Sequence, residues 1–244
     1  MYIGQTERKV NSRPTGGDLV KIDGEWFYKI SNVDNMPPFF MSIVSDANHW
    51  MFIASNGGLS AGRKDCNQSL FPYYTVDKIT ETSEITGSKT ILRVEVNDKT
   101  YLWEPFSVYT NHLYDLETNL FKSEYGNTLI FEQINHDLGL RFRYQWSSSN
   151  KFGFVRQATL TNLGNDSRVI HVLDGIQNLV PYGVEADLQN SYDFASIGQF
   201  MTEDLSTGKI SPLDGIGPQE LEINSPVSSV SNVVTKLFQD VKAS

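Results

Sequence analysis

The sequence predicts an all-β protein, a large antiparallel two-sheet sandwich that ends in a single C-terminal helix. Three observations favour this fold class. The apolar residues come in short runs that alternate with polar residues, which is the period of a half-buried strand. Short segments rich in Asn, Asp, Gly and Ser separate these runs, and these residues form tight turns. No alternation of strand and helix patterns appears, so a doubly wound α/β fold is not expected.

The length and composition fit one large sandwich. The chain has 244 residues, of which 39% are hydrophobic and 12% aromatic. This is enough apolar material to bury a sizeable core, and single β-sandwiches reach this length. We therefore expect residues 1–227 to form one β-sandwich domain and residues 228–244 to form a separate helix.

The first half of the chain contains several strand-like runs. The predicted strands lie at residues 26–30, 39–44, 50–54 and, as a short strand, 73–75. Residues 1–20 are polar and contain Pro14, Gly16 and Gly17, which indicates a mobile or edge segment. Residues 56–67 are rich in glycine, and we expect them to form an irregular loop.

The second half shows the strand pattern more clearly. Here the predicted strands lie at residues 90–96, 100–103, 128–134, 138–146, 152–162 and 168–176. In the run from Leu140 to Trp146 every second residue is apolar, which predicts one buried and one solvated face. Because short turns join the last four strands, we expect these strands to form an antiparallel meander.

The C-terminal segment carries a helical pattern. Ser228 or Ser229 is a suitable N-terminal cap. One face of the helix would carry Val230, Val233, Val234, Leu237 and Val241. Such an apolar face needs a surface to pack on, which is the sandwich, a partner or a further domain.

The charge and the single cysteine limit the function and the location. The net charge is −9 and the isoelectric point is about 4.9. This balance excludes a general nucleic-acid surface and disfavours an anionic membrane, but it is compatible with neutral substrates such as sugars. Cys66 has no partner for an intrachain disulfide. The N-terminal residues lack an apolar signal region and no window has the length of a membrane span, so we expect a cytoplasmic protein.

The usual catalytic motifs are missing. The segment Thr86–Thr90 is similar to the end of a phosphate-binding loop, but its lysine does not follow the glycine directly. The sequence contains no nucleophile elbow, no His-Glu-x-x-His and no paired-cysteine zinc motif. The histidines His49, His112, His136 and His171 have no metal-ligand spacing. We therefore expect no cofactor, no metal and no catalytic residue in this chain.

The tryptophans and two of the histidines have structural interpretations. Turn chemistry explains His136 next to Asp137, and His171 lies within a predicted strand. The tryptophans Trp26, Trp50, Trp103 and Trp146 could act as sugar platforms, but most lie in alternating strands, so core packing is the better interpretation.

The most unusual segment runs from Ser55 to Asp65. Its glycines permit positive φ angles and close backbone approach. The charged residues at its end supply hydrogen-bonding groups that suit sugar hydroxyls, although a long connection would also contain such turn residues. The candidate substrate-binding residues are Asn56, Gly57, Gly58, Arg63, Lys64 and Asp65.

Two stretches carry a resemblance to a known family. The run Ile53–Asp65 resembles the Ser-Asn-x-Gly-Gly…Lys-Asp region of glycoside phosphorylases such as the cellobiose phosphorylases of glycoside hydrolase family 94. The stretch Phe154–Asn162, followed by Arg168–Asp174, resembles their Thr-Leu-Thr-Asn…Arg-x-x-x-Val strand pair. This second motif is general to large sandwiches of the galactose mutarotase type. Together the two stretches cover about half of the chain.

The resemblance implies a supersandwich at the N-terminus of a longer glycoside phosphorylase-like or hydrolase-like enzyme. In that family a linker helix leads to an (α/α)₆ barrel, which carries the catalytic acid and the phosphate site. The sandwich takes part in homodimer contacts and lends a loop to the active-site rim, and the segment Asn56–Asp65 is the matching loop. The continuation Cys66–Pro72 departs from the arginine-rich sequence of cellobiose phosphorylases, so the choice of oligosaccharide does not carry over.

Two other functions remain open at this point. A stand-alone aldose epimerase of the mutarotase type would need an acid and a base, for which Glu132 and His171 are available. A sugar-binding or scaffolding module would need only an exposed face that holds a glycan or another subunit. The non-catalytic domain of a larger enzyme is the function that we expect.

Overall fold

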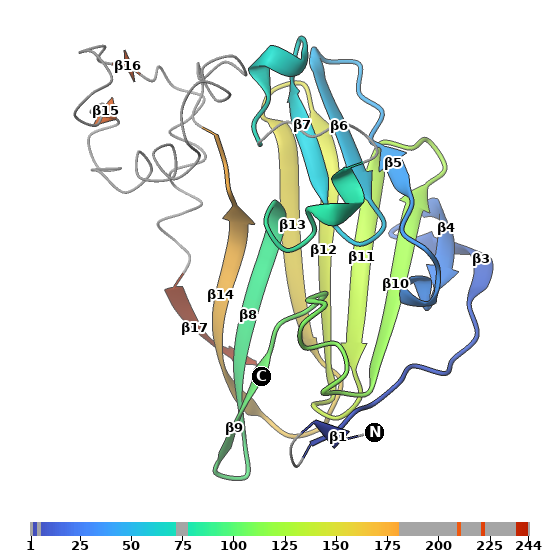
Figure 1. The fold of residues 1–244 in the computed structure, drawn as a ribbon, viewed down its shortest axis with the longest axis vertical. Coiled ribbons are helices and arrows are strands. Elements are labelled where there is room, and N and C mark those ends of the chain that lie inside the picture. The colour runs from blue at the N-terminus through green and yellow to red at the C-terminus, as the bar shows by residue number, and fades with distance from the viewer. Residues whose placement is uncertain are drawn as a thin grey trace.

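The computed structural model describes residues 7–71 and 78–180, together with the backbone of short strands outside these ranges. These residues form an all-β sandwich of antiparallel sheets, as the sequence predicts (Figure 1). The elements outside the two main layers are the strands β1 (Tyr2–Ile3), β2 (Thr6–Glu7), β15 (Lys209–Ile210) and β16 (Leu221–Glu222) and the 3₁₀ turns η1 (Val33–Asn35), η2 (Cys66–Gln68) and η3 (Ile79–Glu81).

One layer is a six-stranded sheet. Its order is β13 (Gly153–Asn162), β12 (Leu140–Ser149), β11 (Thr128–Asn135), β10 (Leu116–Ser123), β4 (Glu25–Ser31) and β3 (Gly16–Ile22). All of the neighbouring strands in this sheet are antiparallel. The strands from β10 to β13 follow one another through short turns, while β4 joins them from a distant part of the sequence.

The other layer consists of two smaller sheets. The first contains β5 (Phe40–Ser42), β6 (His49–Ala54) and β7 (Leu59–Arg63). The second has the order β17 (Phe238–Ala243), β14 (Arg168–Gln177), β8 (Gly87–Val96) and β9 (Lys99–Trp103). Figure 1 shows β8 and β14 next to each other, with β9 at the lower end of the view, and β5, β6 and β7 in its upper part.

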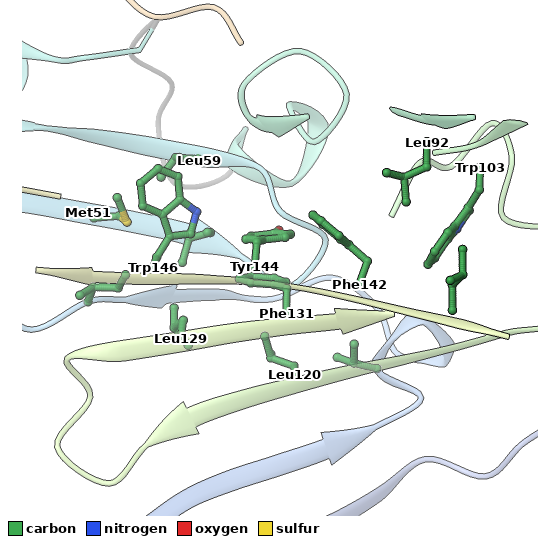
Figure 2. Close-up of a cluster of buried hydrophobic side chains, with 14 of the residues drawn as sticks. Met51, Leu59, Leu92, Trp103, Leu120, Leu129, Phe131, Phe142, Tyr144 and Trp146 are labelled. Atoms are coloured by element: carbon green, nitrogen blue, oxygen red, sulfur yellow. The ribbon is translucent and has the colours of Figure 1, made fainter. Parts of the chain in front are cut away.

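The main core lies between the two layers. On β12 every second side chain is buried, from Leu140 to Trp146, and these side chains face the core. Figure 2 shows Met51 and Leu59 of the smaller sheet across from Tyr144 and Trp146 of the large sheet. The other side chains of β12 point away from the core, because successive side chains of a strand alternate between its two faces.

The predicted meander is confirmed only in part. The strands β11, β12 and β13 are consecutive antiparallel neighbours. The fourth strand, β14, was expected beside β13, and this prediction was wrong, since β14 pairs with β8 and β17 in the other layer. The connection at residues 163–167 therefore crosses between the layers, and a sequence pattern that marks a buried face does not show which sheet the strand joins.

The first half of the chain contains one strand that was not expected, one edge that was expected, and one strand in place of an expected loop. The strand β10 was not predicted, because its polar residues Asn119 and Thr118 are buried and hide the alternation. The strand β3 occupies part of the segment that was expected to be an edge or mobile, and it does form an edge of the large sheet. The segment 56–67 was expected to be irregular, but Leu59–Arg63 form the strand β7.

The C-terminal helix was expected at residues 228–244. Of this segment, Phe238–Ala243 form the strand β17, which pairs along the edge of β14 that β8 leaves free. The helix prediction was therefore wrong for these residues, whose valine and phenylalanine are also strand formers. The rest of the predicted helix, and the short strand expected at 73–75, lie outside the described residues.

Candidate functional site

The glycine-rich segment forms the turn and the second strand of the β6–β7 hairpin. The turn closes with a hydrogen bond from the Gly57 amide to the Ala54 carbonyl (2.8 Å), and Gly57 has a φ angle of +93°. The Asn56 side chain donates its amide to the Thr80 carbonyl (2.8 Å). These contacts hold the turn against η3, so its residues serve the packing of the fold.

Two glycines of this hairpin are needed because other backbone lies against them. A Cβ atom on Gly58 would lie 2.1 Å from the Ile79 carbonyl oxygen. A Cβ atom on Gly62 would lie 2.5 Å from the Gln68 carbonyl oxygen and 2.8 Å from the Trp50 ring. The glycine pattern that the sequence offers as a binding loop thus has a packing explanation at both positions.

The structure does not bring the six predicted site residues together. Asn56, Gly57 and Gly58 precede β7, whereas Arg63 ends it and Lys64 and Asp65 follow it. A strand rises about 3.3 Å per residue, so the two groups are separated by about 17 Å. Lys64 is exposed at a φ angle of +60°, and the Asp65 carboxylate accepts a hydrogen bond from the Asn67 amide (3.0 Å) at the start of η2.

An aromatic row lies on the outward side of β5 and β6, near the charged end of β7. The rings of Trp50 and Phe52 are 5.9 Å apart, and those of Phe52 and Phe40 are 6.5 Å apart. The Trp50 indole N–H donates to the Asp65 carbonyl (3.3 Å). This hydrogen bond connects one of the predicted site residues to the row.

At the same end of β6 the structure has an open hollow of about 620 Å³. Three connections surround it: the one between β5 and β6, the turn between β10 and β11, and the turn between β12 and β13. The lining residues are Val44, Ser45, Asp46, Tyr125, Asn127, Ser148, Ser149, Asn150 and Lys151. Hydroxyl and amide side chains make up most of this lining.

Hydrogen bonds join the three connections around the hollow. The Val44 amide donates to the Gly126 carbonyl (2.9 Å), and the Ser148 hydroxyl donates to the Val44 carbonyl (3.4 Å). The Asn150 side-chain amide donates to the Asp46 carboxylate (3.4 Å). The hollow is therefore formed by loops that hold one another in place.

His49 lies behind the hollow and connects it to β7. Its Nε2 atom is 3.1 Å from the Ser45 hydroxyl, and its ring meets the Phe154 ring edge-on at 4.5 Å. Burial lowers the pKa of His49, and the positive charge of Arg63 lowers that pKa further. The imidazole is therefore neutral near pH 7, and it can form a hydrogen bond with the Ser45 hydroxyl without adding charge to the site.

The described lining of the hollow offers hydroxyl and amide groups, one carboxylate and the ammonium group of Lys151. Among the described residues that line the hollow, Asp46 provides one carboxylate. Glycoside cleavage uses two carboxyl groups, one on each side of the glycosidic bond. Within the described residues, no group of three or more histidine, cysteine or acidic side chains is placed to hold a metal ion. Hydroxyls and amides both donate and accept hydrogen bonds, which matches the hydroxyl groups of a neutral sugar.

The acid–base pair of an epimerase is not assembled. Glu132 lies on β11, where its carboxylate accepts hydrogen bonds from Asn119 (2.9 Å) and Arg143 (2.5 Å). His171 lies on β14, in the other layer, with its Nε2 atom 3.3 Å from the Glu95 carboxylate. Both side chains alternate with core residues and so point outward from their sheets.

The tryptophans divide between the core and the surface. Trp103 and Trp146 are buried, as core packing predicts, while Trp26 is exposed and Trp50 is half-buried. None of the residues that line the hollow was predicted from the sequence as a site residue. Several of them lie in segments that were predicted to be turns, but sequence spacing gives no sign that three turns so far apart meet.

No protein-family model matches the chain, and no curated protein matches it. In the described residues, no helix has the length and apolar character that crossing a membrane requires.

Proposed function

We propose that this chain is a non-catalytic, carbohydrate-binding β-sandwich domain of a larger glycoside phosphorylase-like or hydrolase-like enzyme. The observation that carries the proposal is the hollow beside Tyr125, where neutral hydrogen-bonding side chains make up most of the described lining and Asp46 and Lys151 add one charge of each sign. Its volume lies within the range of ligand sites for small molecules.

Tyr125 provides an apolar face at the rim of the hollow. Its side chain is 73% exposed, so its ring is free to accept a ligand. The C–H face of a pyranose packs on an aromatic ring, while the sugar hydroxyls pair with serine and asparagine side chains. A ligand held in this way would bury Tyr125 and leave Asp46 to accept a hydrogen bond from a hydroxyl.

The larger enzyme would supply the chemistry. The resemblance of Ile53–Asp65 and of the strand pair Phe154–Asn162 and Arg168–Asp174 to glycoside phosphorylases supports this part of the proposal. In such an enzyme a general acid protonates the glycosidic oxygen while phosphate or water attacks the anomeric carbon. The partners of this domain would be an (α/α)₆ barrel, a second copy of the chain and the oligosaccharide itself.

The test is a calorimetric titration of the chain with a panel of neutral oligosaccharides that includes cellobiose. We expect Tyr125→Ala to weaken binding by about tenfold, since it removes the aromatic contact. Tyr109 is a matched control, because it is 72% exposed and does not line the hollow, so Tyr109→Ala should leave binding unchanged. Equal affinities in the two variants would contradict the proposed site, and release of sugar phosphate by the chain alone would contradict its non-catalytic role.

A further inference from the structure

The outward side of β12 carries a line of polar side chains that the core does not use. We name these side chains the β12 track, and its members are Arg141, Arg143, Gln145 and Ser147. Each alternates with a buried core residue, so all four lie on the face of the large sheet that points away from the core. The side chains of Arg141 and Arg143 are 33% and 29% exposed.

A buried carboxylate fixes Arg143 and lies close to Arg141. Glu132 is 3% exposed and lies opposite Arg143 in the register of β11 and β12. Its carboxylate accepts a hydrogen bond from the Arg143 Nε atom (2.5 Å), and the Arg141 Nε atom lies 3.9 Å away. Asn119 donates a further hydrogen bond to Glu132 (2.9 Å), so the carboxylate itself is held on two sides.

An aromatic ring of β10, the strand beyond β11, supports the same arrangement. The Arg143 guanidinium lies 5.5 Å from the centre of the Phe121 ring. The Arg143 Nε atom donates to Glu132, whereas the Arg141 Nε atom forms only a longer ion-pair contact with it. The terminal nitrogens of both arginines have no hydrogen-bond partner among the described residues. A guanidinium that is held at its Nε edge and rests on a ring is pre-organised to donate its remaining N–H groups to a ligand.

The spacing of the two arginines suits one oxyanion. They are two residues apart on one strand, so their Cβ atoms are about 6.7 Å apart on the same face. Thr161 and Thr159 lie opposite them on β13 and add hydroxyl groups beside each arginine. Together these side chains form a polar surface with two forked donors for an anion.

We propose that the β12 track binds the carboxylate of an acidic sugar, a uronic acid within an oligosaccharide. The planar fork of arginine matches the planar carboxylate, and one negative charge suits a protein whose net charge is −9 better than a multiply charged phosphate does. The choice of a sugar as the carrier of the carboxylate rests on the proposed function.

The position of the β12 track indicates a ligand that is longer than a single sugar. Ser149, at the end of β12, belongs to the hollow and lies on the same outward side as the track. From Arg141 to Ser149 the strand rises by about 27 Å, and polar side chains follow one another over the whole of this length. An acidic oligosaccharide that lies along β12 therefore contacts the arginines at one end and the hollow at the other.

The experiment compares an oligogalacturonate with its neutral methyl ester in calorimetric titrations of the full chain. We expect the double variant Arg141→Gln/Arg143→Gln to bind the acid at least tenfold more weakly and to bind the ester as the unchanged chain does. The matched control is Arg93→Gln/Lys99→Gln, which removes two exposed cations from β8 and β9 and should change neither affinity.

Several results would overturn the inference. The inference fails if the unchanged chain binds the acid and the ester with equal affinity. It also fails if both double variants lose the same affinity for the acid, or if the chain binds inorganic phosphate but not the acid. If the ester binds in a Tyr125-dependent manner but the acid gains nothing from the arginines, this inference fails while the proposed function stands. If neither ligand binds, the inference also fails.

Glu132 acts in this site as a positioning residue. Glu132→Gln removes one negative charge, so simple attraction would strengthen binding of the acid, whereas loss of the carboxylate that orients Arg143 would weaken it. We expect weaker binding of the acid, with unchanged binding of the ester measured below the unfolding temperature of the variant. Tighter binding of the acid would show that Glu132 has no positioning role.

Discussion

At the scale of a single residue, Gly58 shows why the glycine-rich segment is better explained by packing than by ligand binding. The sequence offers its glycines as a flexible loop near a sugar, but the Ile79 carbonyl lies where the side chain of any other residue would begin. The turn that contains Asn56 and Gly57 is held by hydrogen bonds to the same neighbourhood. The charged residues at the other end of β7 keep their exposure, and they are the part of the motif that remains near a candidate site.

Gly58→Ala should destabilise the fold by about 3 kcal/mol, because overpacking against backbone cannot be relieved by a rotamer change. Gly16→Ala is the control, since nothing lies within 4 Å of the Cβ position there. Denaturant unfolding followed by fluorescence measures both variants. A Gly58→Ala protein as stable as Gly16→Ala would show that the close approach does not exist.

His49 predicts how stability depends on pH. Its pKa in the folded state is lowered by burial and by Arg63 from an ordinary value of 6.5. A histidine with a lowered pKa binds its proton more readily in the unfolded chain, so its contribution to stability is present above pH 6.5 and is lost as the pH falls below this value.

The corresponding variant is His49→Gln, which keeps a hydrogen-bonding group but does not titrate. We expect its midpoint of thermal unfolding to change less between pH 7 and pH 5 than that of the unchanged chain. His112→Gln is the control for a general effect of removing a histidine. Identical pH profiles for the unchanged chain and the His49 variant would contradict this account.

At the scale of elements, β13 and β14 hold the two layers together with an ion pair. The Arg156 side chain is 8% exposed and donates two hydrogen bonds to the Asp174 carboxylate (2.7 and 2.8 Å). Ser88 and Thr90 of β8 add hydrogen bonds to the same pair. The guanidinium also lies 5.4 Å from the centre of the Tyr144 ring, so this part of the interior is polar.

Breaking this pair on one side should cost about 3 kcal/mol, because it leaves an uncompensated buried charge. We therefore expect Asp174→Leu to destabilise the fold strongly and the double variant Arg156→Met/Asp174→Leu to recover most of the loss. Unfolding in urea measures each variant. The exposed pair of Lys78 and Glu81 gives the control, since Glu81→Gln should change stability by less than about 0.5 kcal/mol.

The elements also show how far the sequence predicts this fold. The strand β12 is predictable, because its core and solvent residues alternate without interruption. The strand β10 is not, because Asn119 is buried to support Glu132, and this requirement comes from tertiary structure. For the same reason the hollow was not predictable, since Asp46, Tyr125 and Asn150 come from three turns that only the folded sheets bring together.

At the scale of the whole molecule, the two faces of the large sheet differ in what they contact. One face packs against the smaller sheets and forms the main core (Figure 2). The other face carries a small apolar cluster around Phe27, Phe121 and Ile130 and, next to it, the polar β12 track. The proposed ligand contacts lie on that second face and at one end of the sandwich, where they do not disturb the packing between the layers.

The long-range pairing of the sheets sets the order in which the protein can fold while it is synthesised. The strand β4 pairs with β10, where Lys29 faces Phe121, and β8 pairs with β14, where Thr90 faces Asp174. Each early strand must therefore leave the ribosome and wait, with an edge unpaired, until a segment more than 80 residues later has been translated. Pairing strands that are so far apart in the sequence slows folding and leaves unpaired strand edges exposed to aggregation during this interval.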